Sequence, residues 1–357
     1  MMFPIVDLRG KPFERGRMHG SLARQRVERS LASYAKLFAF CGLGWPEAQR
    51  LGAAYRGVIG ELDAGLLEEI EGIAAGAGRG VDEILALNAR TEILPPKYLG
   101  DPGECTAIAV RTAASATGGT LLVQNWDWVG AQRDALVVLR SRDEFATLTE
   151  AGMLAKIGFN RHGFGICLNI LRSSDDGKRP GVPVHVLLRA LLGRTGVADA
   201  IAFASKLSFG GSSNVLCADA QGGAASLEFS PKGLRILEPE SGTLCHTNHF
   251  IAPGTEGWQA ALADNLSTVP RLERARAHAA ARPKLGLEDV KCLLRDESAG
   301  ILSICRHPDR SLPEEAQIES VASVIMELAR GVMHVAPDIP SRAEYAQVAL
   351  EAEPVVQ

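Results

Sequence analysis

The pattern of the sequence changes at residue 105, and this change limits the possible folds more than any other feature. In the first hundred residues, apolar side chains recur with the spacing of amphipathic helices. From Cys105 onward they gather in short runs rich in β-branched and aliphatic residues, separated by glycines and charged residues. The sequence therefore predicts an α+β protein with a helical first part and a sheet-rich second part.

Helical and strand patterns then alternate along the chain. Four helices are expected before residue 100: 22–38, one after Pro46, 66–73 and 82–94. Strands are expected at 106–110, 120–126, 135–140, 145–150, 157–171 (a hairpin turning at His162 and Gly163), 213–230, 234–239 and 320–335 (turning at Gly331). Two further helices are expected at 185–194 and 197–207. This order is typical of sheets covered by helices, as in a four-layer αββα sandwich.

Charge and motif content exclude several classes of function. The net charge of −4 leaves no basic stripe for nucleic acid or an anionic membrane. No apolar run has the length of a signal peptide or a membrane span. Glycine-rich phosphate-binding motifs are missing, so we expect no nucleotide or other organic cofactor. The seven cysteines are scattered without a CxxC pair, which favours a reducing, cytoplasmic setting over disulfides or a thiolate zinc site.

Cys105 itself has two interpretations. Free cysteines are among the most buried residues, so simple packing is the ordinary one. The loop before it, KYLGDPGE, instead suggests a cleavable site, because Glu104 places a carbonyl directly before the thiol. Attack of the thiol on that carbonyl, followed by hydrolysis, would leave Cys105 at a new N-terminus. Its α-amine, with a reference pKa of about 7.7–8.0, would then be a built-in base.

Several motifs carry a family resemblance that covers nearly the whole chain. GECTAIAV, residues 103–110, followed by GGTLLVQNWDW, residues 118–128, resembles the cleavage site of the acyl-coenzyme A:6-aminopenicillanic acid acyltransferase family. These are autoproteolytic N-terminal-nucleophile hydrolases with an αββα sandwich fold, related to bile-salt and penicillin V amidases. Residues 70–93 are similar to the family's helical propeptide, HTNHF at 246–250 to an active-site strand, and LSICRH and GVMHVAPDIPSRAEY to the C-terminal part.

The resemblance implies roles for three residues. Cys105 would be the nucleophile exposed by cleavage after Glu104. Asp127, in QNWD, would accept a hydrogen bond from the new α-amine and hold it near the thiol. Asn248, in HTNHF, would contribute its side-chain amide to the oxyanion hole, where a preorganised donor is needed because negative charge develops on the attacked carbonyl. A turn-capping role for Asp127 and a backbone-bonding role for Asn248 stay open.

Four further residues are weaker candidates for substrate binding or support. Asn169 corresponds to a polar residue beside the nucleophile in the amidase relatives. It would either supply a second contact to the oxyanion or substrate, or have only a structural role. Gln124 and Asn125 lie on the strand of Asp127, and the relatives carry an arginine where Gln124 stands. Arg330, in ELARG, matches a C-terminal arginine of the family and would orient the aspartate or thiolate, unless it is an exposed turn residue.

Three alternatives compete with this hypothesis. His246 and His249 form an HxxH pair, but on a strand these side chains would point to opposite faces, so no metal site is expected. A papain-like enzyme would pair Cys105 with His162, His246 or His249. A non-enzymatic binding protein would be expected to have lost the nucleophile or the aspartate, and both are present.

The sequence thus predicts a self-processing amidohydrolase with an N-terminal cysteine. Residues 1–104 would form a helical segment, cut off at Glu104–Cys105 but remaining bound to residues 105–357 as a heterodimer, with further oligomerisation left open. The enzyme would hydrolyse a linear amide of a small molecule through an S-acyl-cysteine intermediate. The alternative is an acyltransferase that moves an acyl group from coenzyme A or an amide to an amine.

Overall fold

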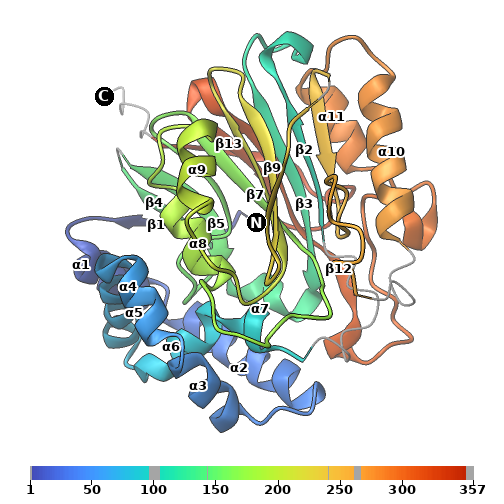
Figure 1. Cartoon of the computed structure of the whole chain (residues 1–357). Helices are drawn as coiled ribbons and strands as arrows, with labels where there is room; N and C mark the ends of the chain where they lie inside the picture. The colour runs from blue at the N-terminus through green and yellow to red at the C-terminus, as the bar shows by residue number, and fades with distance from the viewer. Residues whose placement is uncertain (1, 96–104, 143, 240, 261–266, 351–357) are drawn as a thin grey trace.

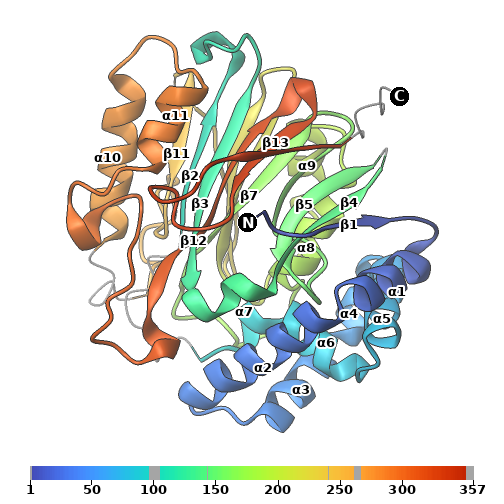
Figure 2. The same cartoon turned by 180° about the vertical axis from the view of Figure 1, so that it is seen from behind.

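Two β-sheets lie face to face, and helices cover the outer face of each, which confirms the predicted four-layer αββα sandwich (Figure 1). The structure is a computed structural model that describes residues 2–95, 105–142, 144–239, 241–260 and 267–350. The helices of the first hundred residues gather at one end of the sandwich, as both views show (Figure 2).

The first sheet has eight strands and includes a strand from the start of the chain. Its order is β1 (Ile5–Leu8), β4 (Leu136–Ser141), β5 (Phe145–Glu150), β6 (Ile157–Asn160), β7 (Phe164–Ile170), β8 (Ser213–Asp219), β9 (Ala224–Ser230) and β10 (Gly233–Leu237). β1 pairs with β4 in parallel and the other neighbours are antiparallel. The predicted hairpin turn is confirmed at Gly163, whose φ of 71° suits a residue without a side chain.

The second sheet has six strands, all antiparallel, and contains both halves of the motif that begins at Cys105. Its order is β11 (Thr243–His246), β2 (Cys105–Val110), β3 (Leu121–Val129), β12 (Ile318–Glu327), β13 (Val332–Ala336) and β14 (Ala346–Ala349). The turn at Gly331, with φ of 62°, lies between β12 and β13 as predicted.

The sequence predicts the helices of one outer layer but not those of the other. The expected pair α8 (Val184–Leu191) and α9 (Val197–Ala204) covers the eight-stranded sheet. The second pair, α10 (Thr268–Ala280) and α11 (Leu287–Leu294), covers the six-stranded sheet and was not anticipated. The buried face of α10 is narrow and partly polar, since Arg271 and Thr268 share it with Leu272 and Ala275.

The helical first part contains more helices than the four expected. Its elements are α1 (Pro12–Leu22), α2 (Arg24–Phe40), α3 (Trp45–Ala53), α4 (Arg56–Leu62), α5 (Ala64–Ala77), α6 (Val81–Asn88) and α7 (Arg90–Ile93). α2, α3, α5 and the α6–α7 pair correspond to the predicted helices.

Helix α1 was missed because it packs through glycines rather than through an apolar stripe. A Cβ at Gly16 would lie 2.0 Å from the backbone oxygen of Glu69, and one at Gly20 would lie 2.2 Å from that of Ile73. The partner helix α5 approaches equally closely, because a Cβ at Gly72 would lie 2.2 Å from the oxygen of Phe13. The two backbones are therefore in direct contact, a packing that hydrophobic periodicity does not report.

We expect Gly72→Ala to lower the free energy of unfolding by about 1–3 kcal/mol, because the added methyl group must push two backbones apart. Gly57→Ala in α4 is the matched control, since an added Cβ there meets no atom within 4 Å. The control should be neutral or stabilise by up to about 1 kcal/mol through the higher helix propensity of alanine. Urea unfolding of both variants measures the difference, and equal stabilities would contradict the close-packing argument.

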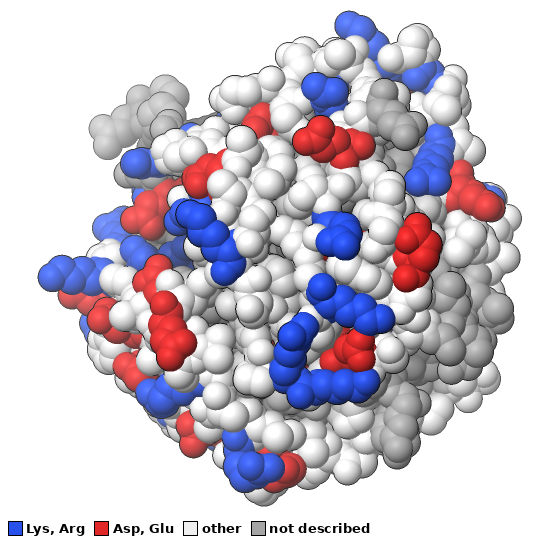
Figure 3. All heavy atoms as spheres, in the orientation of Figure 1, with Lys and Arg blue, Asp and Glu red and all other residues white. Residues whose placement is uncertain are grey.

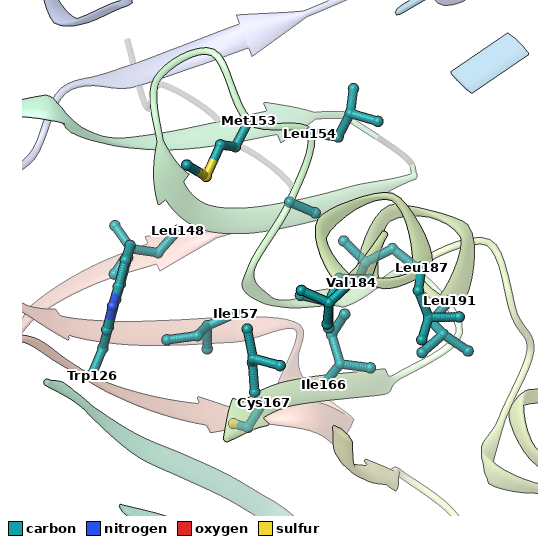
Figure 4. Close-up of a cluster of buried hydrophobic side chains, with 14 of the residues drawn as sticks. Trp126, Leu148, Met153, Leu154, Ile157, Ile166, Cys167, Val184, Leu187 and Leu191 are labelled. Atoms are coloured by element: carbon teal, nitrogen blue, oxygen red, sulfur yellow. The ribbon is translucent and has the colours of Figure 1, made fainter. Parts of the chain in front are cut away.

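The main core lies between the sheets and continues into the helices (Figure 4). Trp126 of β3 projects toward Leu148 of β5, so it links the facing sheets, while Leu187 and Leu191 of α8 lie near Ile166 of β7. A second core fills the space between the six-stranded sheet and the helices α10 and α11. Alternate residues of β2 and β3 therefore enter different cores.

The helical first part contributes buried side chains to the core of the rest of the molecule. Arg90 of α7 is fully buried, with its guanidinium carbon 4.2 Å from the centre of the Trp128 ring and Nη2 3.9 Å from Glu150 Oε1. Tyr34 of α2 donates to the same carboxylate oxygen at 2.7 Å and accepts from Trp128 Nε1 at 3.1 Å. Lys156 lies 3.6 Å from the other oxygen of Glu150. These contacts join both parts of the chain in one buried polar cluster.

The surface carries both signs of charge. On the face drawn in Figure 3, lysines and arginines are interspersed with aspartates and glutamates. In the part of the chain that the structure describes, no helix is long and apolar enough to cross a membrane.

Candidate active site

Cys105 is the first residue of β2, and its side chain faces the core between the sheets. It is 2% exposed, and its partner across the β2–β3 ladder is Trp126. On the other side of β2, the β11 ladder ends at the pair His246–Ala107, so the chain leaves β11 beside Cys105. The segment HTNHF therefore reaches the nucleophile candidate, as the motif predicts.

Asn248 touches Cys105 directly. Its Oδ1 accepts a hydrogen bond from the Cys105 backbone N–H at 3.0 Å, and its Nδ2 donates to the Ile170 carbonyl oxygen at 3.0 Å. The backbone N–H of Asn248 donates to Thr268 Oγ1 at 2.8 Å. These contacts fix the oxygen of the amide toward Cys105 and its nitrogen toward Ile170.

Asn169 approaches Cys105 from the opposite sheet. Its Nδ2 lies 3.4 Å from the Cys105 carbonyl oxygen and 3.5 Å from that of His246. Its Oδ1 accepts from Asn214 Nδ2 at 3.1 Å, across the β7–β8 ladder. The structure thus brings Asn169, Asn248 and Cys105 together, and it adds Asn214, which the sequence did not single out.

Arg271 is the most prominent residue that sequence reasoning missed. It projects from α10, is fully buried, and donates through Nη1 to the Cys105 carbonyl oxygen at 2.7 Å. Nη2 donates to Asn248 Oδ1 at 3.0 Å. The available signal was an arginine beside Leu272 in the stripe that also holds Ala275, but α10 itself was not predicted.

Asp127 lies next to this group but on the other face of the sheet. It follows Trp126, so strand alternation turns its carboxylate toward the second core. There, Oδ1 accepts from Ser320 Oγ at 2.6 Å, and Ser320 Oγ also accepts from the backbone N–H of Arg306 at 3.0 Å. The β3–β12 register shifts between Ser320 and Ala322, a bulge of the kind often found beside active sites.

Gln124 and Asn125 are bound to backbone groups. Gln124 spans the two sheets, because Nε2 donates to the Leu168 carbonyl and Oε1 accepts from the Leu168 N–H at 3.1 Å. Asn125 points to the outer face, where Nδ2 donates to the carbonyl oxygens of Leu294 at 2.8 Å and Ile304 at 3.1 Å. Both residues thus support the strand that carries Trp126 and Asp127.

Arg330 is not brought to Cys105. It follows β12, whose last residue Glu327 pairs with Leu121 of β3. Leu121 in turn pairs with Val110, the last residue of β2. Cys105 is at the other end of β2, about 17 Å away along the strand. The Arg330 side chain is 61% exposed and pairs with Glu327 at 2.8 Å. This geometry matches the exposed turn arginine rather than a residue that orients the aspartate or thiolate.

The candidate histidines are engaged away from the thiol. His246 Nδ1 lies 2.7 Å from the Thr247 carbonyl oxygen and Nε2 lies 2.8 Å from Glu228 Oε1, so both ring nitrogens face acceptors. Burial would raise the pKa of Glu228, but the hydrogen bond and charge of His246 outweigh it and lower that pKa. Burial lowers the pKa of His249 to about 4, and its Nδ1 contacts Thr268 Oγ1 at 2.9 Å. His162 lies in the β6–β7 turn beside Arg161.

Among the described residues, one group combines three side chains of metal-binding type: Glu297, Cys305 and His307, with ligand atoms within 4.8 Å of one another. His307 Nε2 lies 2.7 Å from Glu297 Oε2, and Arg342 donates to Nδ1 at 3.1 Å. An arginine donor occupies the nitrogen that a metal-bound histidine normally uses to donate a hydrogen bond. The geometry therefore fits an ion-pair network.

Comparison with known proteins agrees with the motifs. The family model described as "Acyl-coenzyme A:6-aminopenicillanic acid acyl-transferase" matches residues 115–336. The acyl-coenzyme A:6-aminopenicillanic-acid-acyltransferase 40 kDa form of Emericella nidulans is 31% identical over 325 residues, which cover 84% of each chain.

Solved structures with a similar fold include a mutant of the conjugated bile acid hydrolase of Clostridium perfringens, at 11% identity and a TM-score of 0.44, covering 70% of this chain and 99% of that one. Penicillin V acylase from Agrobacterium tumefaciens matches at 14% identity and a TM-score of 0.45, and the match covers 65% of this chain and 82% of the acylase. The family model and the Emericella relative are sufficient by themselves: this chain is an enzyme of the acyl-coenzyme A:6-aminopenicillanic acid acyltransferase family.

Proposed function

We propose that this protein is a self-processing cysteine amidohydrolase, which cleaves itself before Cys105 and then hydrolyses a linear amide of a small molecule. The observation that carries the proposal is the contact between the Cys105 backbone N–H and Asn248 Oδ1. Cleavage would turn that N–H into an α-amine, already next to the thiol of the same residue and to a buried acceptor. Glu104, the other side of the bond, lies outside the described residues.

The processing step exchanges an amide for a thioester. Cys105 Sγ attacks the carbonyl carbon of Glu104, the peptide C–N bond breaks, and the nitrogen takes the thiol proton to become the α-amine. Water then hydrolyses the thioester, which leaves a carboxylate on Glu104 and a free thiol on Cys105. All groups in this step belong to the chain or to water.

The catalytic cycle repeats this chemistry on a substrate. The α-amine accepts the thiol proton, the thiolate attacks the amide carbonyl, and the leaving amine takes the proton as the C–N bond breaks. Nδ2 of Asn248 is proposed to stabilise the oxyanion, with Asn169 as a second donor. Asp127 is proposed to accept a hydrogen bond from the amine, since the freed chain end can turn toward the neighbouring strand.

The two fragments are proposed to stay together as a heterodimer. β1 belongs to the first fragment but hydrogen-bonds to β4 of the second. Glu69 of α5 forms a buried ion pair with Arg189 of α8, with Nη2 3.1 Å from Oε2. Separation would leave β4 without its partner strand and expose apolar core surface of both fragments to water, which opposes dissociation.

Acyl transfer to an amine is the second candidate, because the Emericella relative is named as an acyltransferase. The same thioester serves both outcomes. Hydrolysis needs only access of water, whereas transfer needs a subsite that holds an amine in attack geometry. We therefore favour hydrolysis. We also propose a cytoplasmic location, in which the seven cysteines, all free in the structure, remain reduced.

The test is to follow the fate of the acyl group. Phenylacetyl amides and phenylacetyl-coenzyme A are supplied to the processed protein with and without a panel of primary amines, including 6-aminopenicillanic acid. We expect the amides to be hydrolysed to phenylacetate without added amine. Consumption of the thioester only when an amine is present, with no amide hydrolysis, would make the protein an acyltransferase. Cys105→Ala provides the blank for uncatalysed thioester loss.

A further inference from the structure

Glu228 is a fully buried carboxylate on β9 that the proposed chemistry does not use. Its Oε1 lies 2.8 Å from Nε2 of His246, the last residue of β11 in the facing sheet. The same oxygen accepts a hydrogen bond from the Ile251 N–H at 2.8 Å, and Oε2 accepts from the Ala252 N–H at 3.1 Å. One carboxylate of the eight-stranded sheet therefore holds both ends of the segment 246–252.

This segment passes beside the nucleophile candidate. Between its two anchored ends, Asn248 Oδ1 accepts from the Cys105 N–H at 3.0 Å. At its start, the His246 carbonyl oxygen lies 3.5 Å from Asn169 Nδ2. A shift of either end would therefore move these groups relative to the thiol, and a misplacement of about 1 Å can reduce a catalysed rate by about 100-fold.

The protonation state of His246 follows from its neighbours. Nδ1 lies 2.7 Å from the Thr247 carbonyl oxygen, which can only accept, and Nε2 faces the carboxylate. A neutral imidazole has one N–H, so one of its nitrogen lone pairs would face an oxygen lone pair. The two backbone N–H groups that bind Glu228 favour its ionised form. The contacts are therefore satisfied by a doubly protonated imidazolium beside a carboxylate.

The other titratable and charged groups near this segment differ from Glu228 in sign or in charge state. They are Cys105 of β2, His249 of the segment itself, and Arg271 and Arg276 of α10. Burial lowers the pKa of His249 to about 4, and the charge of His246 is the next cause, so His249 is neutral near pH 7. Among the described residues, Glu228 is thus the carboxylate bound to His246.

We propose that Glu228 and doubly protonated His246 form a buried clamp that positions the segment 246–252, and that turnover falls at alkaline pH when His246 loses its second proton. The clamp is complete while His246 is charged. It weakens as the pH rises, because deprotonation removes one N–H donor and the positive charge beside Glu228. Both are positioning residues without contact to the substrate. The inference rests on the proposed function, since it takes Cys105 and Asn248 as the groups to be aligned.

The first experiment measures the protonation of His246 directly. Protein labelled with ¹⁵N-histidine is studied by NMR at pH 7.5, and the eight histidines are distinguished by single His→Gln substitutions. An ordinary imidazole, with a reference pKa of about 6.5, is mostly neutral at this pH. We expect both nitrogens of His246 to carry protons, in the wild type and in Cys105→Ala. His162, exposed in the β6–β7 turn, is the internal comparison.

The second experiment removes the charge of the carboxylate. In Glu228→Gln we expect a neutral His246 at pH 7.5 and a kcat per processed molecule about 10–100-fold lower, with KM little changed. The alkaline limb of the wild-type kcat profile should coincide with the titration of His246 and move to lower pH in Glu228→Gln. A merely structural role would reduce yield and stability without moving this limb.

Glu327→Gln is the matched control. Glu327 is also buried, and its Oε1 lies 2.8 Å from Nε2 of the buried His334. This second pair lies at the end of β12 that is remote from Cys105. Glu327→Gln should therefore keep the wild-type kcat and alkaline limb, even if it lowers stability.

The outcomes separate the clamp from the proposed function. A wild type that is neither cleaved nor active on amides overturns the proposed function, and the spectrum of Cys105→Ala still tests the clamp. A neutral His246 at pH 7.5, or an alkaline limb that Glu228→Gln does not move, overturns the clamp alone. The wild-type spectrum decides the matter even if Glu228→Gln does not fold.

Discussion

Cys105→Ala is expected to leave the protein as one chain of 357 residues without measurable turnover, whereas the wild type should yield two fragments, the larger beginning Cys-Thr-Ala-Ile. The physical reason is that one thiol serves both reactions. In the proposed mechanism this thiol attacks the Glu104 carbonyl during processing and the substrate carbonyl afterwards, and alanine has no nucleophile. Intact-mass measurement with N-terminal sequencing detects the cleavage, and an amide hydrolysis assay measures the turnover.

Two further variants sharpen this result. Cys245→Ala, on the neighbouring strand β11, removes another buried thiol and should still be processed. Asp127→Asn keeps the shape of the side chain but removes its charge, and it should slow both cleavage and turnover if Asp127 acts on the amine. Normal maturation of Asp127→Asn would restrict Asp127 to its contact with Ser320. A wild type that remains uncut after prolonged incubation and still hydrolyses amides would contradict the proposal.

Asn248→Ala is expected to reduce turnover per processed molecule by about 10²–10³-fold, the usual loss for one oxyanion donor. The fold should persist, because the Thr268 contact uses the backbone of Asn248 and not its side chain. Single-turnover measurement on processed protein separates this loss from any delay in maturation.

The structure allows the two ends of the Asn248 amide to be tested separately. Asn248→Asp keeps an oxygen to accept from Cys105 and Arg271 but lacks the Nδ2 donor, so it should lose turnover as Asn248→Ala does. Asn125→Ala is the control, since Asn125 is equally buried in the same sheet but bonds to backbone oxygens on its outer face. It should lose stability, not rate per folded molecule. Near-normal turnover in Asn248→Ala would remove Asn248 from the site.

The sequence predicts the parts of this protein in which local pattern and tertiary environment agree. Strand alternation around Cys105 and Trp126, the glycine turns at 163 and 331, and the helices α8 and α9 all follow from periodicity or φ preference. The family motifs placed Cys105, Asn169 and Asn248, and the fold brings these three into contact.

The missed features have a common physical cause. Helix α1 packs by glycine and Arg271 is buried by specific acceptors, and neither produces an apolar stripe. The sequence left two roles open for Arg330, because a motif near the C-terminus does not show at which end of a strand the arginine lies. Only the strand register, which pairs Glu327 with Leu121, shows that it lies far from Cys105.

The parallel pairing of β1 with β4 bears on how this protein can be cut and rebuilt. A gene that begins at Cys105 would encode all the residues of the proposed catalytic machinery and still lack an edge strand of its own sheet. The exposed β4, with the sequence LVVLRS, would present unpaired backbone groups to any passing chain, which is a route to aggregation. Glu150 would at the same time lose Tyr34 and Arg90. The segment before the proposed cleavage site is thus part of one domain, and the proposed backbone break would leave that domain whole while making it two polypeptides.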